Sequence, residues 1–231
     1  MSRLIELLQQ PLADDRRVQE LASNASNEME RVFYTHDGRP ADKWHHYLEI
    51  YDRHLSRYRG RRVRLLEIGV QRGGSLQVWK RYLGPDATIS GVDVDPRCAF
   101  TEPQISAVTG DQKNRLLLTA IASSTSGPLD VVVDDGSHAS FDQIASFETL
   151  YPLLAPNGVY ICEDMHSAYD GQDYHFVARV KDLVDRMHAW YVDDADLAYA
   201  KTTYAVHFYD SMIVIEKRPR DKPFRAVVGC T

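Results

Sequence analysis

The sequence has few cysteines and no long apolar run. Its three cysteines, Cys98, Cys162 and Cys230, are an odd number without the spacing of a metal site, so they predict a reducing compartment and no disulfide framework. No apolar run approaches the ~20 residues that span a bilayer, and the N-terminal stretch lacks the continuous apolar segment and cleavage site of a secretory signal peptide. We therefore predict a cytoplasmic protein with no membrane partner.

The sequence also lacks an excess of basic residues. The chain of 231 residues has 27 lysines and arginines against 33 aspartates and glutamates, which gives a formal net charge of −6. Because domains that bind nucleic acid usually carry a basic face, this balance argues against a nucleic-acid partner. The share of hydrophobic residues, 44%, is typical of a globular protein, and the length suits one sizeable α/β domain.

What the sequence does contain is an alternation of strand and helix patterns. Apolar residues at helical spacing predict helices in residues 4–10, 18–33 and about 44–58. Five segments with strand character follow, separated by helical segments: 63–70, 87–95, 105–111, 129–135 and 159–164. Two further strands, 204–210 and 211–217, have only a tight turn between them.

This order predicts the fold. Strands that alternate with helices form right-handed crossovers and a parallel sheet covered on both faces, whereas a tight turn joins antiparallel strands. We predict an α/β fold, with a Rossmann-like, doubly wound, mainly parallel sheet that ends in an antiparallel hairpin. Residues 1–58 would form an N-terminal helical extension, and residues 59–231 would form the core domain.

Ligands of such sheets bind outside the carboxyl ends of the strands, where this sequence has a glycine-rich turn. Gly69 and Gly73 follow the first strand, and such glycines let backbone amides approach a ligand. The turn lacks the GxGxxG dinucleotide fingerprint because Gln71 stands where its second glycine belongs. The second strand ends at Asp93, where an acidic residue can bind a ribose diol, and Asp111 follows the third strand. A structural turn for the glycines, and capping roles for both aspartates, remain alternatives.

Acidic residues and a histidine follow the fourth and fifth strands. The fourth strand runs into DDGSH, which contains Asp135 and His138, and the fifth ends in Glu163 and Asp164. Carboxylates brought together from adjacent strands disfavour one another's ionised forms unless a cation neutralises them. Oxygen ligands suit a hard ion such as Mg²⁺. We therefore predict a magnesium site, with simple loop caps as the alternative.

These motifs carry a resemblance to a known family. The pattern ExGxxxGGS, the GVDVD strand end, a GD after the third strand and the closing hairpin resemble class I S-adenosylmethionine-dependent methyltransferases, over about residues 63–217. Without the second fingerprint glycine, an NAD enzyme is disfavoured. The resemblance implies that S-adenosylmethionine is bound by Glu67, Gly69, Gly73, Ser75, Asp93, Asp111 and Asp134.

Longer motifs narrow the resemblance. LDVVVDDGSH, LYPLLAPNGVYICEDMHSAY, ADKW and HFYDSMIVIEK are similar to the metal-dependent sugar O-methyltransferases of antibiotic biosynthesis, of the type that methylates mycinamicin-type macrolides and rhamnose. The resemblance implies Mg²⁺ held by Asp135, Glu163 and Asp164, with His138 as the general base. Family members of the mycinamicin type have a large additional N-terminal domain, whereas residues 1–58 are predicted here as short helices.

We therefore predict methyl transfer from S-adenosylmethionine to a sugar hydroxyl of a small-molecule glycoside, by a homo-oligomer. A catechol or phenolic O-methyltransferase is one alternative, because a catechol suits the same metal. A non-catalytic S-adenosylmethionine-binding protein is another, although an intact Asp135, His138, Glu163 and Asp164 argue against it. An iron hydroxylase would need two histidines and one carboxylate, unlike this carboxylate-rich site.

Residues 166–173 are predicted to form a mobile lid. His166 could line the acceptor pocket, and His207 within the last hairpin is predicted to be structural. Three aromatic residues could form a wall for a glycoside, with core packing as the alternative for the last of them: Tyr169, Tyr174 and Trp190.

Overall fold

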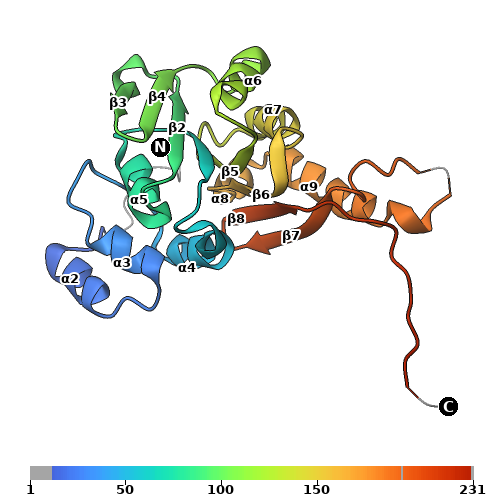
Figure 1. Cartoon of the computed structure of the whole chain (residues 1–231). Coiled ribbons are helices and arrows are strands. Elements are labelled where there is room, and N and C mark those ends of the chain that lie inside the picture. The colour runs from blue at the N-terminus through green and yellow to red at the C-terminus, as the bar shows by residue number, and fades with distance from the viewer. Residues whose placement is uncertain (1–11, 194, 230–231) are drawn as a thin grey trace.

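An eight-stranded sheet forms the centre of the structure, a computed structural model that describes residues 12–193 and 195–229 (Figure 1). The strands are β1 (Arg64–Ile68), β2 (Thr88–Asp93), β3 (Phe100–Glu102), β4 (Ile105–Thr109), β5 (Leu129–Asp134), β6 (Leu154–Cys162), β7 (Thr203–Tyr209) and β8 (Met212–Lys217). They lie in the order β3-β4-β2-β1-β5-β6-β8-β7. The strands from β4 to β6 in this order are parallel, whereas β3, β8 and β7 are antiparallel to their neighbours.

The predicted doubly wound sheet and its closing hairpin are therefore confirmed, with two differences. The three-residue strand β3 pairs with β4 and was not predicted. Strand β6 begins at Leu154 rather than at residue 159, because the predicted turn around Asn157 is an irregularity within the strand. Asn157 takes the left-handed conformation there, with a φ of 69°.

Eight α-helices lie in the described residues, and most of them pack on the two faces of the sheet. The α-helices are α2 (Asp15–Ser23), α3 (Glu28–Tyr34), α4 (His45–Leu55), α5 (Gly74–Leu83), α6 (Arg115–Ser124), α7 (Ser140–Leu150), α8 (His166–Gly171) and α9 (His175–Met187). Short 3-10 turns are η1 (Ser56–Tyr58), η2 (Pro96–Cys98) and η3 (Ala189–Tyr191). The single helix predicted over 18–33 is two helices, because Asn27 caps α3 by accepting a hydrogen bond from the amide of Glu30. The helix predicted over 4–10 lies outside the described residues.

Two hydrophobic clusters fill the space between the sheet and its helices. Alternate strand residues point to opposite faces, so Val131 and Val133 join the cluster under α3, α4 and α5, while Val132 joins the cluster under α6, α7 and α9. Leu48 of α4 lies fully buried in the first cluster. Helices α3 and α4 thus share a core with the sheet. None of the helices in the described ranges is long and apolar enough to cross a bilayer.

The loops that follow β1 and β5 touch each other at the centre of the sheet, where the strand order reverses. Gly69 has a φ of 87°, and a Cβ atom on it would lie 2.0 Å from the carbonyl oxygen of Asp135. Only glycine fits this approach. The carboxyl ends of β1, β2, β5 and β6 therefore meet at one edge of the sheet, the usual place for a ligand site in this topology.

Candidate active site

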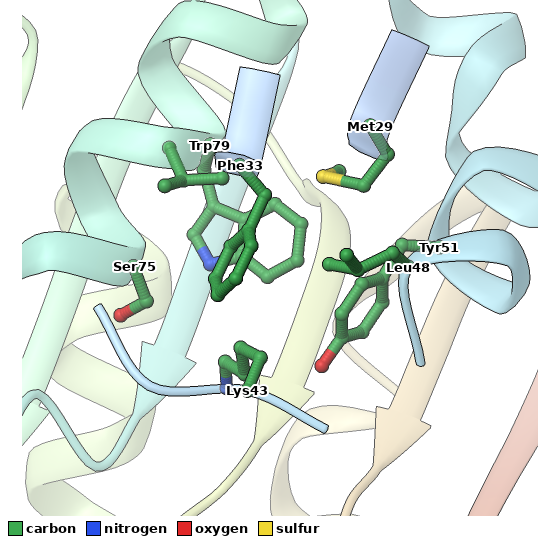
Figure 2. Close-up of a pocket in the computed structure, with 8 residues that line it drawn as sticks. Met29, Phe33, Lys43, Leu48, Tyr51, Ser75 and Trp79 are labelled. Atoms are coloured by element: carbon green, nitrogen blue, oxygen red, sulfur yellow. The ribbon is translucent and has the colours of Figure 1, made fainter. Parts of the chain in front are cut away.

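The ammonium group of Lys43 lies among three carboxylates at this edge. Its Nζ is 2.5 Å from Oδ2 of Asp135, 2.9 Å from Oε2 of Glu163 and 3.5 Å from Oε1 of Glu67. The Lys43 side chain is only 5% exposed. Figure 2 shows it between Ser75 of α5 and Tyr51 of α4, at one side of a small cavity lined mainly by apolar side chains.

The charges of this group are coupled. Burial alone lowers the pKa of Lys43, but the carboxylates around it outweigh burial and raise the pKa well above its usual value. Burial, and next the neighbouring Asp135, raises the pKa of Glu163. One ammonium cannot neutralise three carboxylates, so this edge of the sheet favours a further positive charge.

Asp135, His138 and Asp164 form a second part of the same site. One ligand atom from each lies within 4.8 Å of the others, and Nε2 of His138 is 3.7 Å from Oδ2 of Asp164. Both His138 and Asp164 are left-handed, with φ values of 58° and 56°. Tyr47 of α4 donates a hydrogen bond of 2.8 Å to Oδ1 of Asp164.

The residues present fit a hard divalent cation. Asp135 and Asp164 offer oxygen atoms on one side, and Oε1 of Glu163 is buried without a hydrogen-bond partner. Glu163 itself lies against Lys43 and is not within the compact trio of Asp135, His138 and Asp164. Oxygen donors with excess negative charge are what Mg²⁺ prefers.

The predicted cofactor side is built around the turn after β1. Ser75 donates a hydrogen bond of 2.6 Å to the buried Glu67. Gly73 is the N-cap of α5, with a φ of 84°. Oδ2 of Asp93 accepts hydrogen bonds from the amides of Val70 and Gln71, at 2.8 and 2.9 Å. Asp93 thus holds the glycine-rich turn, as in the capping alternative, and its contact with a ribose stays a prediction.

Asp111 and Asp134 have local roles within the protein. Asp111 accepts a hydrogen bond from the amide of Lys113 at 2.9 Å, and Asn114, not Asp111, caps α6. Asp134 is 1% exposed and accepts hydrogen bonds from Tyr160 at 2.7 Å and from Gln112 at 3.3 Å. Burial raises its pKa to about 6. Two protein donors thus hold the buried Asp134 carboxylate in place, and its contact with the cofactor stays a prediction.

Comparison with known proteins identifies the domain that carries this site. Residues 66–165 match the family described as a methyltransferase domain. This stretch of the chain is therefore similar to a methyltransferase domain. The matched range runs from β1 to just past Glu163 and Asp164, so it includes most of the predicted site.

The relatives of this methyltransferase domain act on sugars, according to their names. The chain is 35% identical, over 199 residues, to 8-demethyl-8-alpha-L-rhamnosyl tetracenomycin-C 2'-O-methyltransferase of Streptomyces olivaceus, a match that covers 77% of this chain and 52% of that protein. It is 40% identical, over 132 residues, to mycinamicin VI 2''-O-methyltransferase of Micromonospora griseorubida, covering 54% of this chain and 33% of that protein. The chain spans about half the length of the first of these relatives.

A solved structure agrees with these relatives. The MycE methyltransferase from the mycinamycin biosynthetic pathway, in complex with Mg, SAH and mycinamycin VI, superposes with a TM-score of 0.70 at 30% sequence identity. The match covers 87% of this chain and 53% of that one. The resemblance predicted from the motifs is thus confirmed.

Three of the residues predicted to line an acceptor pocket, His166, Tyr169 and Tyr174, lie in or next to α8. Nδ1 of His166 lies 2.5 Å from the hydroxyl of Ser211, and Tyr169 and Tyr174 form an exposed edge-to-face pair with ring centroids 5.3 Å apart. Trp190 instead donates a hydrogen bond to the carbonyl of Ala200, as expected for a packing residue. Most of the predicted lid, residues 166–171, is the short helix α8.

Lys43 is the residue of the candidate site that sequence reasoning missed. The ADKW motif marked its segment as similar to the sugar O-methyltransferases, but the lysine received no role. Its hydrogen-bond partners Asp135 and Glu163 are 92 and 120 residues away along the chain. No local pattern could have joined them.

Proposed function

We propose that the chain transfers a methyl group from S-adenosylmethionine to a sugar hydroxyl of a glycosylated natural product, with Mg²⁺ as a cofactor. One observation carries the proposal: Asp135, His138 and Asp164 converge at the edge of the sheet where the strand order reverses. The relatives named as O-methyltransferases of rhamnosyl and mycinamicin compounds, and the MycE complex with Mg and SAH, support the substrate class and the cofactors.

Asp135, Glu163 and Asp164 would hold the magnesium ion. When bound, Mg²⁺ supplies a positive charge that lowers the pKa of a hydroxyl group beside it. The buried, unpartnered Oε1 of Glu163 and the excess of carboxylates over Lys43 support this assignment.

His138 would accept the proton of the sugar hydroxyl at Nε2, the nitrogen nearest to Asp164. Its side chain is 31% exposed, so an acceptor can reach it, and it lies in the short loop between β5 and α7. General-base assistance of this kind contributes about 10²–10⁴-fold to a reaction rate. Asp164 is in turn positioned by the hydroxyl of Tyr47.

The turn after β1 would bind S-adenosylmethionine. Asp93 holds the amides of Val70 and Gln71, and the glycines at positions 69 and 73 let the turn pack closely against Asp135 and Phe100. Glu67 and Ser75 lie beneath the turn, and Asp111 would border the far end of the ligand.

The cellular location, the oligomeric state and a lid are further parts of this proposal. The free Cys98 and Cys162 are consistent with a cytoplasmic location. A homo-oligomer is also proposed, and a lid formed by residues 166–173 is proposed from their content of tyrosine, glycine and aspartate. Because the chain spans about half of its first curated relative, the identity of the glycoside is open to assay.

The test is a methyl-transfer assay with purified chain, Mg²⁺ and a panel of rhamnosylated, macrolide deoxysugar and catechol acceptors. We expect transfer to a sugar, a fall in rate of about 10²–10⁴-fold in His138→Gln, and unchanged binding of S-adenosylhomocysteine by calorimetry. His188→Gln serves as the control, because His188 is exposed and its ring forms a hydrogen bond of 2.9 Å with the carbonyl of Val184, outside the candidate site.

Each alternative gives a different result. Transfer to catechols alone would replace the sugar by a phenolic acceptor. Binding of S-adenosylhomocysteine without transfer to any acceptor would favour a non-catalytic binding protein. If His138→Gln were as active as His188→Gln, His138 would not be the general base.

A further inference from the structure

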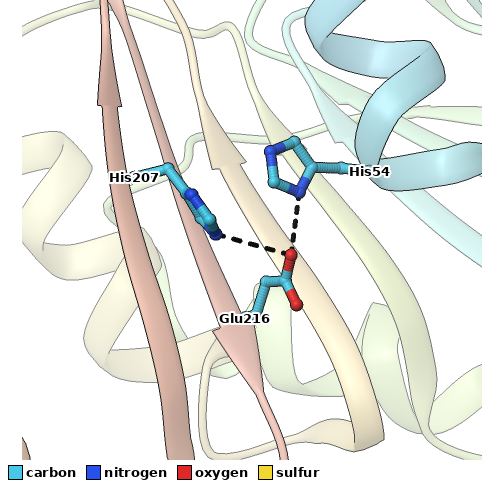
Figure 3. A group of neighbouring side chains, drawn as sticks. All are labelled: His54, His207 and Glu216. Atoms are coloured by element: carbon cyan, nitrogen blue, oxygen red, sulfur yellow. Dashed lines mark hydrogen bonds and ion pairs between the residues drawn. The ribbon is translucent and has the colours of Figure 1, made fainter.

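A second cluster of metal-binding side chains lies away from the methyltransferase site, where α4 packs on the closing hairpin. It consists of His54 near the end of α4, His207 of β7 and Glu216 of β8. Figure 3 shows both imidazole rings directed at the Glu216 carboxylate. These three residues take no part in the function proposed above.

The spacing of their donor atoms suits a small metal ion. Oε1 of Glu216 is 2.9 Å from Nδ1 of His54 and 3.5 Å from Nε2 of His207, and the three ligand atoms all lie within 4.8 Å of one another. Donor atoms bound tetrahedrally at about 2.0–2.1 Å from zinc lie roughly 3.3 Å apart. The two distances to the carboxylate fall on either side of that value.

The surroundings hold the three ligands in place. His54 is 3% exposed, and its other ring nitrogen, Nε2, lies 2.9 Å from the hydroxyl of Tyr209. Such an outer hydrogen bond commonly fixes the ring of a metal-binding histidine. Nε2 of His207 is buried, has no hydrogen-bond partner and faces the same carboxylate oxygen.

The positive charge of Arg57 lies beside the Glu216 oxygen that does not face the two histidines. Nη1 of Arg57 lies 3.4 Å from Oε2 of Glu216, which leaves Oε1 to the histidines. Arg53 is the other cation near this cluster, and its guanidinium is paired with Glu49 at 2.8 Å. One carboxylate and two imidazoles are a common donor set for Zn²⁺ and related transition-metal ions.

We propose that His54, His207 and Glu216 bind a divalent transition-metal ion of the Zn²⁺ type and that the ion fastens α4 to the β7–β8 hairpin. The three ligands come from one helix and two strands, so a bound ion joins elements that are distant in sequence. Helix α4 also carries Tyr47 and follows Lys43, so the same ion would stabilise the segment that completes the methyltransferase site.

The test measures Zn²⁺ and Co²⁺ binding by the full, tag-free chain after removal of metals. An Asp135→Asn substitution in every variant weakens the other cluster that could take these ions. In this background His207→Gln and Glu216→Gln are compared with His188→Gln, which removes an exposed histidine outside the cluster. The readouts are bound zinc by elemental analysis after gel filtration and the visible absorption of bound Co²⁺.

We expect the His188→Gln control to retain one zinc ion more than His207→Gln, with at least a tenfold weaker affinity in the latter. Zinc should also raise the melting temperature of the control and leave that of His207→Gln unchanged. Equal zinc content and an equal rise in melting temperature in the two variants would overturn the proposal. If Glu216→Gln does not fold, His207→Gln decides alone, because the His207 side chain is 35% exposed and its replacement leaves the core intact.

Discussion

Lys43 is the single residue on which the carboxylate cluster most depends. Its removal leaves the buried Glu67 and Glu163 and the partly exposed Asp135 without a compensating charge. Breaking a buried ion pair in this way costs about 3–5 kcal/mol of unfolding free energy. We expect that loss in Lys43→Met, measured by urea denaturation in EDTA, against a change within about 0.5 kcal/mol in Lys181→Met on the exposed side of α9.

Magnesium should partly rescue the same variant. A divalent cation replaces the lost ammonium charge, so added Mg²⁺ should stabilise Lys43→Met more than it stabilises the wild type. If Lys43→Met and Lys181→Met lost the same stability and Mg²⁺ had no effect, the three carboxylates would instead be neutralised by bound protons.

Gly69 is the second critical residue, for a steric reason. A Cβ atom there would overlap the carbonyl oxygen of Asp135, and alanine disfavours the φ of 87°. We expect Gly69→Ala to lower the unfolding free energy by more than about 2 kcal/mol. Gly171→Ala is the control, because no atom lies within 4 Å of its added Cβ and α8 tolerates alanine. Similar urea midpoints for both variants would contradict the close approach of the two loops.

Site residues could be predicted from the sequence only where they come soon after a predicted strand. Asp135, His138 and Asp164 lie directly after β5 and β6, and parallel strands bring such positions together. Alternation along a strand says that Asp134 and Asp135 point apart, but not which of them faces the crevice. Lys43 could not be placed, because its contacts depend on how a loop far away in sequence packs on the finished sheet.

At the scale of elements, a hydrogen bond joins the end of α7 to β7. The hydroxyl of Tyr151 lies 2.8 Å from Oγ1 of Thr203, and the Tyr151 side chain is almost fully buried. Burial raises the pKa of Tyr151 to about 12. The unfolded chain releases this proton near its ordinary pKa of about 10, so the contribution of Tyr151 to stability is present below pH 10 and is lost between pH 10 and 12.

The expected loss is up to about 3 kcal/mol over that interval, from two pKa units at 1.36 kcal/mol each. We therefore expect the unfolding free energy of Tyr151→Phe to fall less steeply with pH above 10 than that of the wild type. The measurement is urea denaturation at pH 8 to 11, with the difference between the two proteins taken at each pH. If the unfolding free energies of the two proteins ran parallel with pH, Tyr151 would titrate alike in the folded and unfolded states, as expected for a hydroxyl in contact with water.

Helices and strands were predictable where the apolar pattern was long. The helix divided at Asn27 shows the limit, because helical spacing continued through residues 24–27 while a side chain able to cap a helix began a new one. The three residues of β3 are too few for a pattern, and pairing with β4 alone makes them a strand. The bulge at Asn157 resembled a turn because its residues are those of turns.

For the molecule as a whole, the early helices belong to the same folding unit as the sheet. Leu48 of α4 is fully buried in the cluster that contains Val131 of β5, and Tyr51 packs edge to face on Trp79 at 4.9 Å. We expect Leu48→Ala to cost about 2–5 kcal/mol and to shift tryptophan fluorescence and far-UV dichroism together. Leu116→Ala is the control, since Leu116 is 84% exposed. Two separated transitions would instead support an independent N-terminal unit.

The left-handed backbone of His138 and Asp164 limits how stable this protein can become. Each such conformation in a residue other than glycine costs roughly 1–3 kcal/mol. Glycine would relieve the cost at either position but would also remove the imidazole or the carboxylate. A gain in stability at either position would therefore come at the expense of a group that the proposed reaction needs, so activity and stability should trade against each other at this pair.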